Sequence, residues 1–254
     1  MQRAYKLLAN KIKPHKRQRF ERMNIVKKNR WKKWAAVLSA AAIAVTLTAC
    51  MPNMMGMQNN TEPESLALDK NALQEMDLNA FYSEENGYSF HGVKWHSTPD
   101  EVEKQLGYPM GEPVDLKNSS ITCYRPEAAA ELILGRVCSI VELAFNEEDK
   151  LYNVSFQYSA GHDMDSAGLD VFVTELVAEF EKLYGEYTVA SETSQLPTVE
   201  MHSTTYKWEL PIGNDMYSSL QVAFANTTTE DTDIVVVGVV GYTAEERAKE
   251  MEKE

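Results

Sequence analysis

The chain has 254 residues, with 25 lysines and arginines against 38 aspartates and glutamates, for a formal net charge of −13. The charges are segregated: residues 1–33 hold thirteen basic residues and one acidic residue (net +12), whereas residues 34–254 hold twelve against 37 (net −25). Such an acidic body repels nucleic acid and anionic lipid headgroups, so we expect no nucleic-acid partner.

An uncharged, alanine-rich segment from Trp34 to Cys50 follows the basic region. Only sixteen residues, 34–49, precede the cysteine, whereas a membrane helix needs about 20. The pattern therefore favours a cleaved export signal, and the basic flank fits because positive charge stays on the cytoplasmic side. A start at Met23 would give this signal ordinary proportions, so the choice between Met1 and Met23 stays open.

The segment ends in Leu47-Thr48-Ala49-Cys50: an aliphatic residue, two small residues and a cysteine. After a basic flank and an apolar run, this order resembles the lipobox of bacterial lipoprotein signal peptides. The resemblance implies cleavage between Ala49 and Cys50. It also implies a diacylglycerol on the Cys50 thiol, whose fatty acyl chains, such as palmitate, hold the protein at the extracytoplasmic face of the cell membrane. An uncleaved anchor, or an ordinary signal with an incidental cysteine, is the alternative, and both also export the rest of the chain.

Removal of residues 1–49 leaves 205 residues, enough for one large domain or two small ones. We expect residues 50–85 to be the lipidated cysteine and a flexible tether, because the first part of this range is rich in Met, Asn, Pro and Glu and has no hydrophobic period. Its four methionines suit Cu(I) chemically, but a methionine-rich linker is the simpler interpretation. These methionines are Met51, Met54, Met55 and Met57.

The first folded unit is expected over residues 86–160. Alternation over residues 88–96 predicts a short strand with Tyr88, Phe90 and Trp95 facing the core. A helix should then begin at Pro99, because Thr98 and Glu101 form a capping box and proline is favoured at the first helical position. Glycine at 107 should end it.

The phrase GVKWHSTPDEVEKQLGYP at residues 92–109 resembles the opening of small outer-membrane assembly lipoproteins and of β-lactamase-inhibitor-protein-like domains. The matching positions are Gly92, Ser97, Val102, Leu106, Gly107 and Pro109. The resemblance implies a helix beside an antiparallel sheet, and it implies fold rather than function.

Strands are predicted over residues 120–124, 137–145 and 151–158, with a polar hairpin connection at 146–150. In the segment 151–158, polar side chains alternate with Val154 and Phe156, which predicts one buried face and one wet face.

The second unit is expected over residues 161–254. Apolar spacings of three and four predict an amphipathic helix from Asp165 or Ser166 to Gly185. A polar loop near residues 191–198 should follow, and then strands at 206–210, 220–224 and 234–240. The last of these has no polar alternation and is expected to be central and covered on both faces. Thr243 and Glu246 predict a final acidic helix that frays.

This order predicts an α+β fold with two helix-plus-antiparallel-sheet units, and one continuous sheet with helices on one face is the alternative. Cys123 and Cys138 lie in or beside strands that could be neighbours, so they are a candidate disulfide. Two buried thiols are the alternative.

Four histidines follow the signal: His91, His96, His162 and His202. His91 and His96 could bind zinc only with further ligands. In the 162–165 loop, we expect the carboxylates to favour the N-terminus of the following helix. We expect surface or hydrogen-bonded histidines, with no metal site and no cofactor.

The sequence contains no Gly-x-Ser-x-Gly elbow, no His-Glu-x-x-His helix and no phosphate-binding glycine-rich loop. We therefore expect no enzymatic activity. The sequence predicts a lipid-anchored, non-catalytic binding or scaffolding module of the bacterial envelope, whose partner is an envelope protein or a small ligand. Exposed aromatics on a sheet face or helix groove should form its contact surface. A metal or small-ligand receptor is the alternative, and an envelope hydrolase is less favoured.

Overall fold

The computed structural model describes residues 70–114, 116, 120–195, 200–227 and 233–251. The predicted signal, its cleavage site at Ala49 and Cys50, and the four tether methionines lie outside the described residues. Within them, no helix is long and apolar enough to cross a bilayer.

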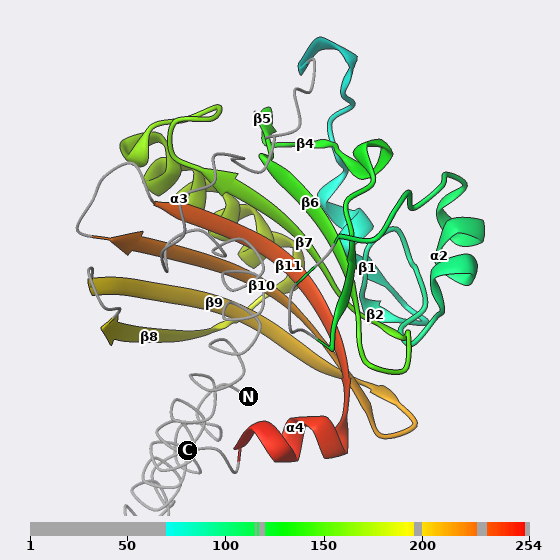
Figure 1. The fold of residues 1–254 in the computed structure, drawn as a ribbon. Helices are drawn as coiled ribbons and strands as arrows, with labels where there is room; N and C mark the ends of the chain where they lie inside the picture. Colours follow the sequence, from blue (N-terminus) through cyan, green and yellow to red (C-terminus); the bar gives the residue numbers. More distant parts are fainter. Residues whose placement is uncertain (1–69, 115, 117–119, 196–199, 228–232, 252–254) are drawn as a thin grey trace, which may run out of the picture.

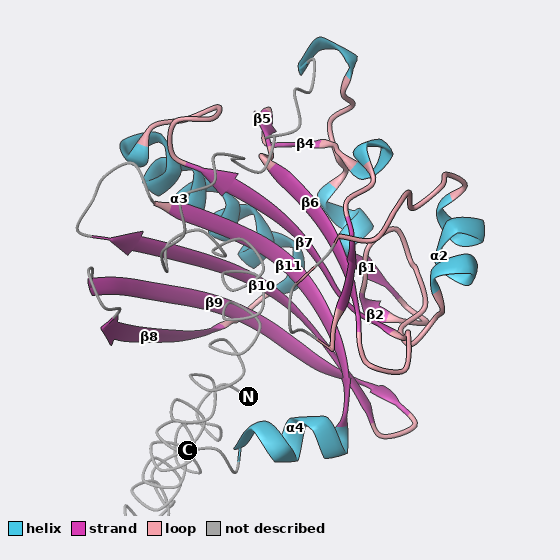
Figure 2. Cartoon of the chain, viewed as in Figure 1, coloured by secondary structure: helices cyan, strands magenta, loops and turns pink. Residues whose placement is uncertain are grey.

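A seven-stranded antiparallel sheet organises the fold, in the order β3-β6-β7-β11-β10-β9-β8 (Figures 1 and 2). Its strands are β3 (Thr122–Tyr124), β6 (Ile140–Phe145), β7 (Leu151–Ser159), β8 (Thr188–Gln195), β9 (Glu200–Gly213), β10 (Met216–Thr227) and β11 (Ile234–Thr243). Two small hairpins lie outside it, β1 (Tyr82–Ser83) with β2 (Gly87–Tyr88) and β4 (Leu132–Ile133) with β5 (Arg136–Val137). Strands thus outweigh helices in this α+β arrangement.

The sheet is continuous across the boundary that the sequence predicted at residue 160. Strand β11 pairs with β7 from Ile234 opposite Ser159 to Val240 opposite Asn153. The preference for two separate helix-plus-sheet units is therefore wrong, and the alternative of one continuous sheet is confirmed. The physical reason is that the buried backbone of β11 needs hydrogen-bond partners along both of its edges. Strand β10 provides them on one edge, and β7 provides them on the other.

Helix α3 (Ser166–Tyr184) covers one face of the sheet (Figure 1). The side chain of Asp165 caps it by accepting a hydrogen bond from the backbone N–H of Gly168, at 2.7 Å. Its apolar stripe is buried as predicted, and each large side chain buried there contributes about 1.5–3 kcal/mol. The buried residues are Leu169, Phe172, Val173, Leu176, Val177 and Phe180.

Strand β11 is central, as predicted. Val235, Val237 and Val239 belong to the core under α3, but on the other face Val236 shares only a small cluster with Ala223. Met201 and Ile234 pack against that cluster. Both faces of β7 are also buried, since Asn153 is 3% exposed, so the expected wet face is wrong.

Strand β8 occupies residues 191–195 of the loop expected near residues 191–198, and residues 196–198 lie outside the described residues. It pairs with β9 from Thr188 opposite Lys207 to Gln195 opposite Glu200. Its polar sequence is typical of an edge strand, whose outer side has no sheet partner.

The core also includes residues assigned to the tether. Phe81 is fully buried and meets the rings of Phe156 and Phe180 edge-on, at centroid distances of 6.0 and 5.6 Å. Met76 is also buried. The tether expectation is therefore wrong for the last ten residues of 50–85, because isolated apolar residues give no periodic signal.

Helix α2 (Pro99–Leu106) begins and ends as predicted. Thr98 N–H donates to Glu101 Oε2 at 2.8 Å, and Glu101 N–H donates to Thr98 Oγ1 at 3.4 Å. Gly107 then adopts φ of +80°, in the left-handed region. Local capping thus sets both ends of the helix.

Helix α4 (Ala244–Met251) also begins with its predicted capping box, in which Thr243 N–H donates to Glu246 Oε2 at 2.6 Å. An ion pair between Arg247 and Glu209 of β9 ties it to the sheet. This tertiary contact opposes the fraying that an isolated acidic helix would show.

Candidate functional site: a pocket beside helix α2

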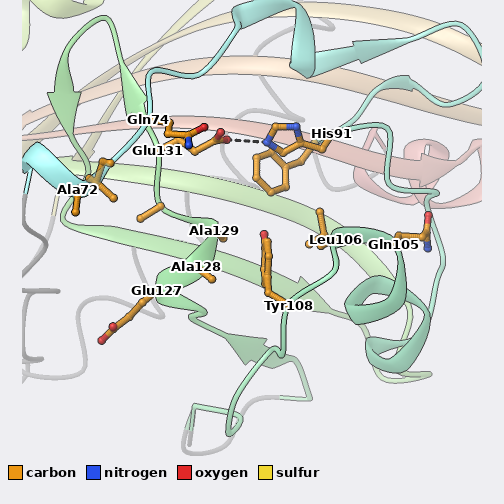
Figure 3. Close-up of a pocket in the computed structure, with 13 residues that line it drawn as sticks. Ala72, Gln74, His91, Gln105, Leu106, Tyr108, Glu127, Ala128, Ala129 and Glu131 are labelled. Atoms are coloured by element: carbon orange, nitrogen blue, oxygen red, sulfur yellow. Dashed lines mark hydrogen bonds and ion pairs between the residues drawn. The ribbon is translucent and has the colours of Figure 1, made fainter.

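A pocket of about 530 Å³ lies between the end of α2 and three other segments: residues 72–74, the turn at 90–91, and residues 127–131 (Figure 3). This volume falls within the range of about 300–1,000 Å³ that small-molecule sites occupy. Apolar side chains and a few polar groups line it.

His91 reaches the pocket from a tight turn. Val93 N–H donates to the carbonyl of Phe90 at 2.9 Å, and His91 and Gly92 both have positive φ, +47° and +69°. The expected strand over residues 88–96 is therefore wrong, because the chain turns here and only Gly87–Tyr88 are strand. The predicted burial of Tyr88, Phe90 and Trp95 is nevertheless confirmed.

The His91 backbone is strained, since a left-handed conformation costs a residue other than glycine about 1–2 kcal/mol. Two contacts hold it there. Its N–H donates to the carbonyl of Ala80 at 3.0 Å, and its ring packs on Phe90 with centroids 4.4 Å apart. Strain of this kind clusters at functional sites.

Glu131 faces His91 across the pocket. Its Oε2 lies 2.7 Å from His91 Nε2, and the two side chains are 22% and 40% exposed. A short parallel contact fixes Glu131: Leu132 N–H donates to the carbonyl of Gln74, and Met76 N–H donates to the carbonyl of Leu132, both at 2.8 Å. The pair itself adds little stability, about 0–1 kcal/mol, because solvent reaches it.

Tyr108 stands in the pocket with its hydroxyl end directed toward the His91–Glu131 pair (Figure 3). Its hydroxyl oxygen is buried and has no hydrogen-bond partner in the part of the chain that the structure describes. Burial, and secondarily the Glu131 carboxylate, raises the pKa of Tyr108 well above its usual value. The hydroxyl therefore stays protonated at neutral pH.

The two body cysteines lie elsewhere, and within the described residues no disulfide joins them; both thiols are buried. Cys123 pairs with Ala144, six residues along the chain from Cys138. At about 3.3 Å per residue, that separation is roughly 20 Å, far beyond the roughly 7 Å between Cα atoms that a disulfide allows. The candidate disulfide is therefore wrong, and the alternative of two buried thiols is confirmed.

The other histidines do not join the pocket. His202 lies 2.9 Å from Glu200, and His96 Nε2 is buried with no hydrogen-bond partner among the described residues. Asp163 accepts from the N–H of Val137 at 3.0 Å, so only Asp165 of the 162–165 loop caps α3. In the described part of the chain, no three His, Cys, Asp or Glu side chains are arranged to hold a metal.

The aromatic contact surface expected from the sequence is not found among the described residues. They expose four large apolar side chains, and Tyr82 is the one aromatic among them. The others are Val171, Leu183 and Val189.

The sequence did not single out Tyr108 or Glu131. The turn signal at Phe90-His91-Gly92 was present and could have placed His91 at a bend, but nothing local indicates that three distant segments meet there. Comparison of the chain with family models, curated proteins and solved structures finds no match.

The lining combines apolar side chains with a few polar groups. None of its thirteen lining residues is Ser, Thr, Cys or Lys, so the described lining offers none of these side-chain nucleophiles. A histidine paired with a carboxylate can act as a general base. In this pocket, the His91–Glu131 pair also places two polar groups beside the apolar lining.

Proposed function

We propose that the protein is a lipid-anchored, non-catalytic binding module at the extracytoplasmic face of the bacterial cell membrane, with the pocket beside α2 as its ligand site. The lipobox-like sequence at residues 47–50 supports the anchor and the location. The pocket supports the binding role.

The His91–Glu131 pair beside an apolar lining is the observation on which the binding role depends. Both side chains of the pair are partly exposed, so a ligand in the cavity can reach them. Leu73, Leu106 and Tyr108 belong to the rest of the lining. Small-molecule sites combine such an apolar lining with a few placed polar groups.

Site-specific photocrosslinking in intact cells tests the proposal. A benzophenone amino acid replaces Gln74, an exposed residue of the pocket lining, and a matched variant carries it at Val171, which is 51% exposed on the outer side of α3. We expect an adduct from position 74, small-molecule or protein, that is absent from position 171.

Mass spectrometry of the protein identifies either kind of adduct, and a Cys50→Ser form is the unanchored control. Equal adducts from positions 74 and 171, or none from position 74, would contradict binding at the pocket.

A further inference from the structure

We infer that the pocket takes a protonated amine with a small apolar body. This rests on the proposed function, since it names the ligand class of the same site. Charge, hydrogen-bonding capacity and shape each point to this class.

The charge of the lining favours a cation. Glu131 contributes a carboxylate to the cavity, whereas the Glu127 side chain points away from it (Figure 3). No lysine or arginine is among the thirteen described residues that line the pocket. His91 is the one basic side chain there, and Glu131 already faces it. An anionic ligand would meet like charge, whereas an ammonium would meet opposite charge. The net charge of −25 over residues 34–254 also steers cations toward the body.

The unused hydrogen-bonding capacity of the lining favours a ligand that donates hydrogen bonds. Glu131 uses Oε2 toward His91, and its Oε1 has no partner among the described residues. An ammonium has three N–H donors and no acceptor. It therefore suits a site where a carboxylate oxygen has no donor.

The apolar part of the lining favours a ligand with a compact apolar body that can contact an aromatic ring. Phe90, which is almost fully buried, belongs to the apolar part of the lining together with Leu73 and Leu106. Tyr108 adds a second ring. Aromatic faces attract cations within about 6 Å. A ring or short chain bearing one amino group therefore matches both the polar and the apolar parts of the lining.

Three probes of matched size separate charge from shape: 2-phenylethylamine, 2-phenylethanol and 3-phenylpropanoate. Titration calorimetry with the full-length chain at neutral pH should give the order amine, alcohol, acid, with the amine at least tenfold tighter than the alcohol. Glu131→Gln should weaken amine binding about tenfold and leave alcohol binding nearly unchanged. Tyr108→Phe removes only the buried hydroxyl and should leave amine binding nearly unchanged.

The matched control is Glu148→Gln, which removes an exposed carboxylate in the β6–β7 hairpin, outside the pocket lining, and should change nothing. Circular dichroism melting confirms that each variant folds. The inference is overturned if the alcohol or acid binds as tightly as the amine, if Glu131→Gln leaves amine binding unchanged, or if no probe binds. Tighter binding of the acid would refute the proposed amine ligand but would still support ligand binding at the pocket. If no probe binds, the amine inference fails, and the crosslinking experiment at position 74 alone tests the binding role.

Discussion

Removal of the Glu209 carboxylate should destabilise the protein strongly, because three donors converge on it. Lys207 and Tyr242 both donate to Oε2, and Arg247 of α4 donates to Oε1. Lys207 is 4% exposed. Loss of one partner from a buried ion pair costs about 3–5 kcal/mol. Since Glu209 itself is 20% exposed, we expect Glu209→Ala to cost about 3 kcal/mol, near the lower end of that range.

The aromatic surroundings support this magnitude. The Arg247 guanidinium lies 4.4 Å from the centre of the Tyr217 ring, and that ring stacks on Tyr242 with an interplanar angle of 7°. Without Glu209, Arg247, which orders this stack and the first turns of α4, would lose its ion-pair partner. Urea unfolding measures the loss, which corresponds to roughly 6–12 °C in Tm at about 2–4 °C per kcal/mol.

The pH dependence gives a second readout. Burial acts to raise the pKa of Glu209, but the charge and hydrogen bond of Lys207, the Tyr242 hydroxyl and Arg247 outweigh it and hold the pKa below its usual value. A carboxyl group with a lowered folded pKa stabilises the protein above its unfolded pKa, about 4.3, and this stabilisation is lost as pH falls through the folded pKa. Glu209→Gln should lack this acid-sensitive part of the stability.

The matched control is Glu175→Ala, which removes an exposed carboxylate on α3. A loss of under about 1 kcal/mol for Glu209→Ala, equal to this control, would refute the reasoning.

Three further outcomes are expected. Gly241→Ala should cost about 1–3 kcal/mol in urea unfolding, because an added Cβ would lie 2.1 Å from the Trp95 ring, whereas Gly107→Ala should cost only the backbone strain of its +80° φ, about 1–2 kcal/mol. Burial raises the pKa of Cys138 to about 12, so an alkylating reagent should modify this thiol only after denaturation, and rapid reaction with the folded protein would contradict the packing. Metabolic labelling with a fatty-acid analogue should mark the chain and fail with Cys50→Ser; an unlabelled wild type, or a mature N-terminus away from residue 50, would refute the lipid anchor.

The sequence by itself determined the local elements. Capping residues lie within three or four positions of one another, so Thr98 with Glu101 and Thr243 with Glu246 marked helix starts that the structure confirms. The 146–150 connection closes as a hairpin, with Asn146 N–H donating to the carbonyl of Lys150 at 2.9 Å. Each of these signals involves groups that stay neighbours in any conformation of the chain.

Only the tertiary structure decided the single sheet and the pocket. The pairing of β7 with β11 joins residues 75 to 87 positions apart. Backbone hydrogen bonds between strands are the same for every residue type, so the sequence does not reveal this pairing. His91, Tyr108 and Glu131 likewise come from three separate segments, brought together by a strained turn, a helix end and a short parallel contact. Local patterns marked helix ends and one hairpin turn, whereas burial of the shared core determined which distant segments come together.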